Sequence, residues 1–211
     1  MGPGRVAIAL IATVAVVRTA PAIESTTTAG SLAARSLAEC ERGRRESTRA
    51  ERAAAFEAGL ALAERAVHMD DADASAHFAV FCNRGEQLRL DGEKLSSFME
   101  FRSVMRELDR TLDLDPHHLK AMASKGILLM RLPRLLGGDA ATGEQILREV
   151  VARDPGALAS RLALAERCRS RGEMHEARAF AGRALEIASE RGLDDKVEEA
   201  EATLAKIDAA R

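Results

Sequence analysis

The chain has 211 residues, with 31 basic and 33 acidic side chains and a net charge of −2 at pH 7. This balance supplies no excess of positive charge for a polyanion, and the absence of Trp and Tyr removes the usual platforms for base stacking. We therefore expect no nucleic-acid partner and no general attraction of the chain to anionic membranes.

The first 22 residues have the pattern of a cleaved signal peptide. A short start with one positive charge precedes twelve residues without charge at 6–17, and Ala20-Pro21-Ala22 offers the small residues that signal peptidase reads. Twelve residues are too few to span a bilayer, which takes about 20. We predict a periplasmic or secreted protein with no stable membrane insertion after cleavage. An uncleaved anchor and a merely apolar N-terminus are the alternatives.

Residues 23–30 are predicted to be a flexible leader, and residues 31–211 a single all-α domain. Apolar residues recur at helical spacing, and no stretch alternates with the period of two that strands require. Asp-Gly and Asp-Pro pairs punctuate the pattern between helices. The predicted helices, in chain order, cover 31–45, 48–68, 74–90, 94–113, 117–131, 139–153, 157–171, 174–190 and 193–210.

Four nine-residue segments align without gaps, at 63–71, 108–116, 147–155 and 181–189. Their starts are 45, 39 and 34 residues apart, and the last interval is the period of a tetratricopeptide repeat (TPR). The sequence therefore predicts an α-solenoid of about four TPR-like helix hairpins, closed by a capping helix at 193–210. In the third repeat, Gly126 takes the position where two helices approach closely.

The third repeat also contains the most distinctive segment, the sequence RLPRLLGGD at 131–139. Pro133 is expected to end one helix, the glycines to allow positive φ, and Asp139 to cap the next helix. The segment resembles the LPxLLGGD turn of a bacterial family of exported TPR proteins, similar to the TatT-like T-component of certain tripartite transporters. The resemblance implies a helical periplasmic scaffold with a pore or groove for a small or lipophilic ligand.

Three cysteines, Cys40, Cys82 and Cys168, lie far apart in the sequence without metal-ligand spacing. Cys82 and Cys168 fall where a helix would bury a small apolar side chain, so we expect buried structural thiols. One disulfide or one reactive thiol are the alternatives.

The sequence offers weak signals for catalysis, a cofactor or a metal, and we expect none of the three. The segment 138–144 has the glycine spacing of a phosphate loop, but Glu144 occupies the lysine position, where its charge would repel phosphate. His117 and His118 are adjacent, so on a helix they point in different directions and do not chelate together.

In a TPR solenoid the first helix of each hairpin lines the concave surface, so the expected function is capture of a protein or peptide there. This non-catalytic scaffold would aid assembly of an envelope complex or work with a transporter. The alternative is a small-molecule-binding component associated with a transporter, with an enclosed apolar pocket near Met130 and Leu162. Some of these side chains could instead pack between helices. The predicted concave positions are Phe78, Cys82, Glu86, Lys120, Ala123, Ile127, Met130, Arg131, Leu162, Glu166, Arg169 and Ser170.

Overall fold

The computed structural model describes residues 28–92 and 97–210, and in these residues every regular element is helical. This confirms the predicted all-α solenoid, while the predicted signal peptide lies outside the described residues. The α-helices are α1 Ala29–Arg45, α2 Arg49–Met69, α3 Ala74–Asp91, α4 Ser97–Leu114, α5 Leu119–Arg131, α6 Ala140–Arg153, α7 Leu158–Ser170, α8 Met174–Glu190 and α9 Asp194–Ala209. A short 3-10 helix, η1 Arg134–Leu136, lies in the turn between α5 and α6.

Polar side chains fix where the helices begin. Asp73 and Asp139 each accept hydrogen bonds from two backbone amides at the start of α3 and α6, as the sequence predicts for Asp139. Thr28 forms a capping box with Ser31, so α1 begins at Ala29, inside the segment predicted to be a flexible leader. His118 caps α5 through Nδ1, which accepts the amide of Ala121, and the helix therefore begins two residues later than predicted.

The helices pair as antiparallel hairpins, α1 with α2, α3 with α4, α5 with α6 and α7 with α8, and small residues let paired helices approach closely. In the α5–α6 pair, a Cβ added to Gly143 would lie 2.6 Å from the carbonyl oxygen of Gly126, and one added to Gly126 would lie 2.7 Å from a methyl carbon of Leu147. The predicted close approach at Gly126 is thus present. α9 packs against α7 and α8, and its Ala200 and Ile207 are fully buried there, as expected of the predicted cap.

A buried polar group joins the first three helices. The amide nitrogen of Asn83 in α3 donates to the hydroxyl of Ser36 in α1 at 2.9 Å, and that hydroxyl donates to the carbonyl of Gly59 in α2 at 2.7 Å. Both side chains are fully buried. Because buried hydrogen bonds require defined geometry, they fix the register of these helices.

A disulfide between Cys40 and Cys82 links α1 to α3 across 42 residues of sequence. The expectation of free structural thiols was wrong for this pair, because the packing of α1 on α3 brings their Cα atoms to 6.3 Å. Cys168 is a buried free thiol, as expected. Burial and the nearby Glu176 raise the pKa of the Cys168 thiol to about 11, so it is protonated at neutral pH.

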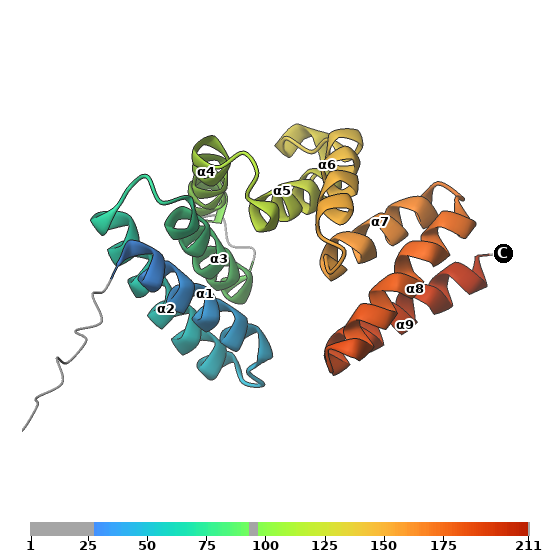
Figure 1. The fold of residues 1–211 in the computed structure, drawn as a ribbon, viewed down its shortest axis with the longest axis horizontal. Helices are drawn as coiled ribbons and strands as arrows, with labels where there is room; N and C mark the ends of the chain where they lie inside the picture. Colours follow the sequence, from blue (N-terminus) through green and yellow to red (C-terminus); the bar gives the residue numbers. More distant parts are fainter. Residues whose placement is uncertain (1–27, 93–96, 211) are drawn as a thin grey trace, which may run out of the picture.

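The helices follow an arch (Figure 1). One limb holds α1–α4, the other holds α7–α9, and α5 with α6 joins them at the top. The hydrophobic clusters among the described residues lie between Leu32 and Ile207, so the chain from residue 23 onward contains this core. Among the described residues, no helix is both long and apolar enough to cross a bilayer.

Candidate binding face

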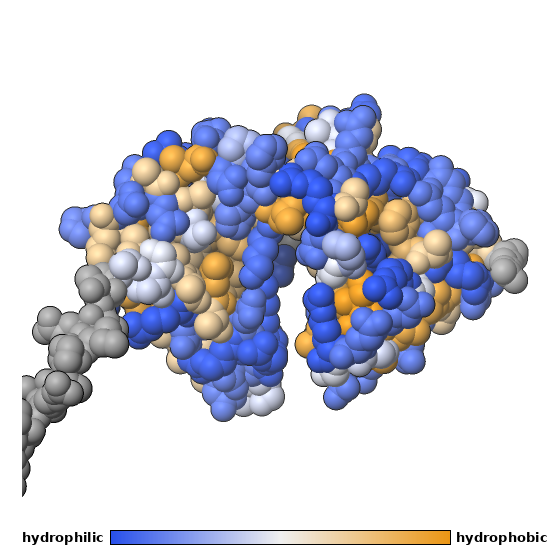
Figure 2. All heavy atoms as spheres, in the orientation of Figure 1, coloured by the Kyte–Doolittle hydropathy of each residue, from blue (hydrophilic) through white to orange (hydrophobic). Residues whose placement is uncertain are grey.

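A hollow separates the two limbs of the arch and opens on the side away from α6 (Figure 2). Its lower walls are mostly hydrophilic, and a hydrophobic patch lies at its roof, near the position of α5 in Figure 1. We take the candidate residues for this hollow from the faces of α5 and α7 that packing among the described residues leaves open.

Two faces of α5 are occupied by packing. Leu128 and the buried Ala121 contact the cluster around Phe78, and Lys125 pairs with Asp109 of α4 at 2.5 Å. On the opposite side, Gly126 lies against Leu147 of α6. The remaining face repeats at intervals of four, three and four residues, which is one stripe of a helix. Its members are Lys120, Ser124, Ile127 and Arg131, all half-buried or exposed.

The same reasoning gives the free face of α7. Leu158 and Leu162 pack on α8 and α9, whereas Arg167 and Arg171 reach Glu144 of α6. The stripe left over consists of Ala159, Ala163, Glu166 and Ser170. We call the free stripes of α5 and α7 together the inner face. It combines small residues, one apolar side chain at Ile127 and charges of both signs.

The structure divides the predicted concave residues into two groups. Phe78, Glu86 and Leu162 are 5, 5 and 7 % exposed. The sequence placed these three on the open surface, but they pack between helices, because neighbours on both sides cover their faces. Phe78 packs on Leu108 and Leu162 on Ile187.

Cys82 is a fourth buried member, and it and Glu86 have partners of another kind. Glu86 accepts a hydrogen bond from Arg44 at 2.8 Å, and Cys82 is in the disulfide. The other group remains accessible, and its role in binding stays a prediction. Its members are Lys120, Ala123, Ile127, Met130, Arg131, Glu166, Arg169 and Ser170.

Ion pairs hold several charges of the inner face in place. Lys120 lies 3.6 Å from Glu41 of α1, and Arg169 donates to Glu166 at 2.5 Å. The hydrogen bond from Arg169 lowers the pKa of the Glu166 carboxyl, which is therefore charged at neutral pH. Arg131, in contrast, has no ion-pair partner among the residues that the structure describes. Its guanidinium is the cation of this face most available to a ligand.

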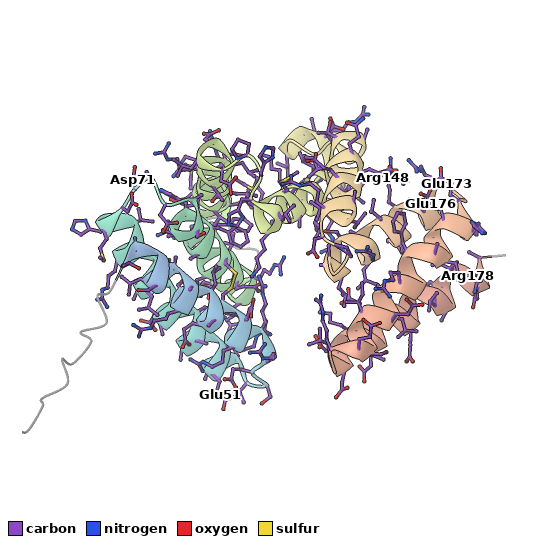
Figure 3. All side chains as sticks on the ribbon, viewed as in Figure 1. Glu51, Asp71, Arg148, Glu173, Glu176 and Arg178 are labelled. Atoms are coloured by element: carbon purple, nitrogen blue, oxygen red, sulfur yellow. A yellow bond between two sulfur atoms is a disulfide. The ribbon has the colours of Figure 1, made fainter. Side chains whose placement is uncertain are left out.

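A second charged cluster joins α6, α7 and α8 on the outer side of the arch (Figure 3). Glu144 is 8 % exposed and accepts hydrogen bonds from Arg148, Arg167 and Arg171. Burial would raise the pKa of the Glu144 carboxyl, but the hydrogen bonds from these arginines outweigh it and lower the pKa. Arg148 also donates to Glu176 at 2.6 Å. Sequence reasoning compared Glu144 with a phosphate loop and missed this role.

Part of that cluster resembles a metal site in composition. The ligand atoms of Cys168, Glu173 and Glu176 lie within 4.8 Å of one another. However, Arg148 and Arg171 already neutralise the two carboxylates, and the Cys168 thiol donates its proton toward Glu176. A metal would have to displace these arginines and deprotonate a thiol with a pKa of about 11. The cluster therefore fits a structural role.

No protein-family model matches the chain, and no curated protein matches its sequence. Among solved structures, a thermophilic TPR protein from Thermus thermophilus, TTC0263, is similar with a TM-score of 0.61 at 17 % identity, over 86 % of this chain and 84 % of that chain. A double mutant of MamA RS-1 has a TM-score of 0.45 at 15 % identity, over 82 % of this chain and 94 % of that chain. From the helices and from the first of these similarities, the chain has the fold of a TPR-like helical solenoid.

Proposed function

We propose that the protein is an exported, non-catalytic scaffold that binds a protein or peptide partner on the inner face of the arch. The observation that carries the proposal is the stripe on α5, where Ile127 stands one helical turn before Arg131, a cation with no ion-pair partner in the described part of the chain. An apolar anchor beside a cation suits a segment that carries an apolar residue next to an acidic one. The hollow between the limbs leaves room for such a segment (Figure 2).

Export is supported by the N-terminal sequence pattern and by the disulfide. Disulfides persist in oxidising compartments and are rare in the cytosol, and Cys40–Cys82 joins two helices of the core. The turn at 131–139 resembles that of TatT-like T-components, so a transporter or another envelope complex is a candidate partner. That assignment rests on the sequence of the turn alone.

The small-molecule alternative has less support. It predicted an enclosed apolar pocket near Met130 and Leu162. Leu162 instead contacts Ala184, Ile187 and their neighbours, which fill the space around it. Met130 lies against Gly143 of α6. We therefore place the ligand on the open inner face.

The proposal is tested by co-purification from the native envelope with tagged variants. Arg131→Glu and Ile127→Glu should each lose the bound partner at least about tenfold, because they reverse the cation or place a charge at the apolar anchor. Ala179→Glu, at an exposed position of α8 away from the inner face, is the matched control and should retain the partner. Equal partner yields from all three variants, with unchanged melting temperatures, would place binding elsewhere.

A further inference from the structure

The turn between α5 and α6 exposes apolar side chains to an unusual degree. Leu135 is 98 % exposed and Leu136 is 50 % exposed, whereas large apolar side chains in the rest of the fold are mostly covered. Pro133 and Arg134 beside them are exposed as well. This turn lies near the top of the molecule in Figure 1, away from the open side of the hollow, and so plays no part in the inner face.

Backbone hydrogen bonds hold the turn in one shape. The amides of Leu136 and Gly138 both donate to the carbonyl of Pro133, and the amide of Asp139 donates to the carbonyl of Leu129. Gly137 has a φ of 87°, which favours glycine, and a Cβ on Gly138 would lie 1.8 Å from the carbonyl oxygen of Leu132. The exposed leucines are therefore presented by a fixed turn, and burying them requires no further ordering of the backbone.

The positive charge of Arg134 beside the leucines favours contact with a negatively charged surface. Arg134 stands directly before the two leucines and is exposed like them. The acidic residue of the turn, Asp139, directs its carboxylate onto the amides of Ala141 and Thr142, and it also attracts Arg134 electrostatically. The tip thus combines apolar side chains with a neighbouring cation, although the chain as a whole is slightly acidic.

The small size of the tip favours a lipid surface over a protein. A specific protein interface buries about 800 Å² on each side, more than a narrow turn of a few residues supplies. A bilayer, in contrast, deforms around a convex tip, buries the leucines at the boundary of headgroups and acyl chains, and leaves arginine at the phosphates.

We propose that residues 132–138 form a membrane-contact tip, in which Leu135 and Leu136 enter the interface of an anionic phospholipid bilayer while Arg134 contacts lipid phosphates. The contact is peripheral and reversible, and no helix spans the membrane through it. It orients the arch with the hollow facing away from the bilayer. This inference is independent of the partner on the inner face.

The absence of Trp from the sequence gives a sharp test. Leu135→Trp, in the chain 23–211 that contains the described core, introduces the sole indole. Its fluorescence should shift to the blue with vesicles of equal parts phosphatidylglycerol and phosphatidylcholine, and less with pure phosphatidylcholine. The matched control is Met69→Trp, at a 53 % exposed residue at the end of α2 in the first limb, and its fluorescence should not shift.

Sedimentation of protein variants with the same vesicles tests which residues of the tip contribute to membrane binding. Leu135→Ala with Leu136→Ala should lower binding at least about tenfold, because most of the apolar surface of the tip is removed. Arg134→Gln and added salt should weaken binding several-fold through the lost phosphate contact. All these positions are exposed, so melting temperatures should not change.

Three results would overturn the proposal. The first is the absence of a shift at position 135 with anionic vesicles, and the second is an equal shift at position 69, which indicates non-specific adsorption. The third is a shift that appears without lipid and grows with protein concentration, which would assign the tip to self-association.

Discussion

At the scale of single residues, Glu144 of α6 pairs with more arginines than any other acid among the described residues. Its carboxylate joins three arginines from α6 and α7, and Arg148 extends the contact to Glu176 of α8. Removing the carboxylate leaves three partly buried guanidinium groups without their shared acceptor. Such a loss costs more than the loss of an exposed ion pair, where water replaces the partner.

Glu144→Gln should therefore lower the free energy of unfolding by about 2 kcal/mol. Glu149→Gln removes an exposed i,i+4 partner of Arg153 and should cost less than about 0.5 kcal/mol. Urea unfolding at pH 7 compares the two variants. Equal losses would contradict the role given to Glu144.

Glu144 also makes the free energy of unfolding depend on pH. Since the folded state lowers the pKa of Glu144, its stabilisation is complete above the ordinary glutamate pKa of about 4.3 and is lost as pH falls through the folded-state value. The stability difference between wild type and Glu144→Gln should be constant from pH 7 to 5 and shrink below about pH 4. A difference that grew in acid would contradict the direction of the pKa shift.

Replacing glycine by alanine should have opposite effects on stability at two positions. Gly143→Ala would place a Cβ 2.6 Å from the carbonyl of Gly126 and should destabilise the fold by roughly 1–3 kcal/mol. Gly182, inside α8, has open space where a Cβ would lie, and Gly182→Ala should stabilise the fold by roughly 0.5–1 kcal/mol. Thermal unfolding of both variants shows whether each substitution raises or lowers the stability. A stable Gly143→Ala would mean that α5 and α6 separate more easily than their packing implies.

At the scale of helices, the sequence predicts where each helix begins and ends, whereas contacts between helices far apart in the sequence appear only in the structure. Helix bounds follow from apolar spacing and caps such as Asp73 and Asp139, so most ends lie within two or three residues of the prediction. The buried state of Phe78 and Leu162 could not be predicted in this way. It depends on which helices flank each one, and that is set by tertiary packing.

The disulfide could not be predicted from the sequence either, because its cysteines are 42 residues apart and meet only after α1 packs on α3. Closing a loop of that length restricts the unfolded chain, and the restriction stabilises the fold by about 4 kcal/mol. Cys40→Ala with Cys82→Ala should therefore lower the unfolding free energy by about 2–4 kcal/mol.

Reducing agent supplies the control for this prediction. It should destabilise the wild type and Cys168→Ala alike and leave the double variant unchanged, since Cys168 has no disulfide to lose. A double variant that still responds to reductant would contradict the pairing.

At the scale of the whole molecule, the arch presents two different surfaces. The hollow carries the inner face of α5 and α7, and the top carries the apolar turn (Figures 1 and 2). Two ion pairs, Lys120 with Glu41 and Lys125 with Asp109, join α5 to the first limb, beside the apolar packing of Ala121 on the cluster of Phe78 and Leu108. Three of the predicted positions on α5, Lys120, Ile127 and Arg131, share one stripe of that helix and remain accessible, whereas the predicted positions on α3 are buried. Their role in binding stays a prediction.

The most direct test of the central claim is site-specific photocrosslinking in the native envelope. A photoreactive amino acid replaces Ser124 on the inner face or, as the control, Ala179 on the exposed side of α8. If the inner face is the binding site, position 124 should give one discrete crosslinked product, identifiable by mass spectrometry, and position 179 should give none. Crosslinks from position 179 alone, or the same products from both positions, would contradict it.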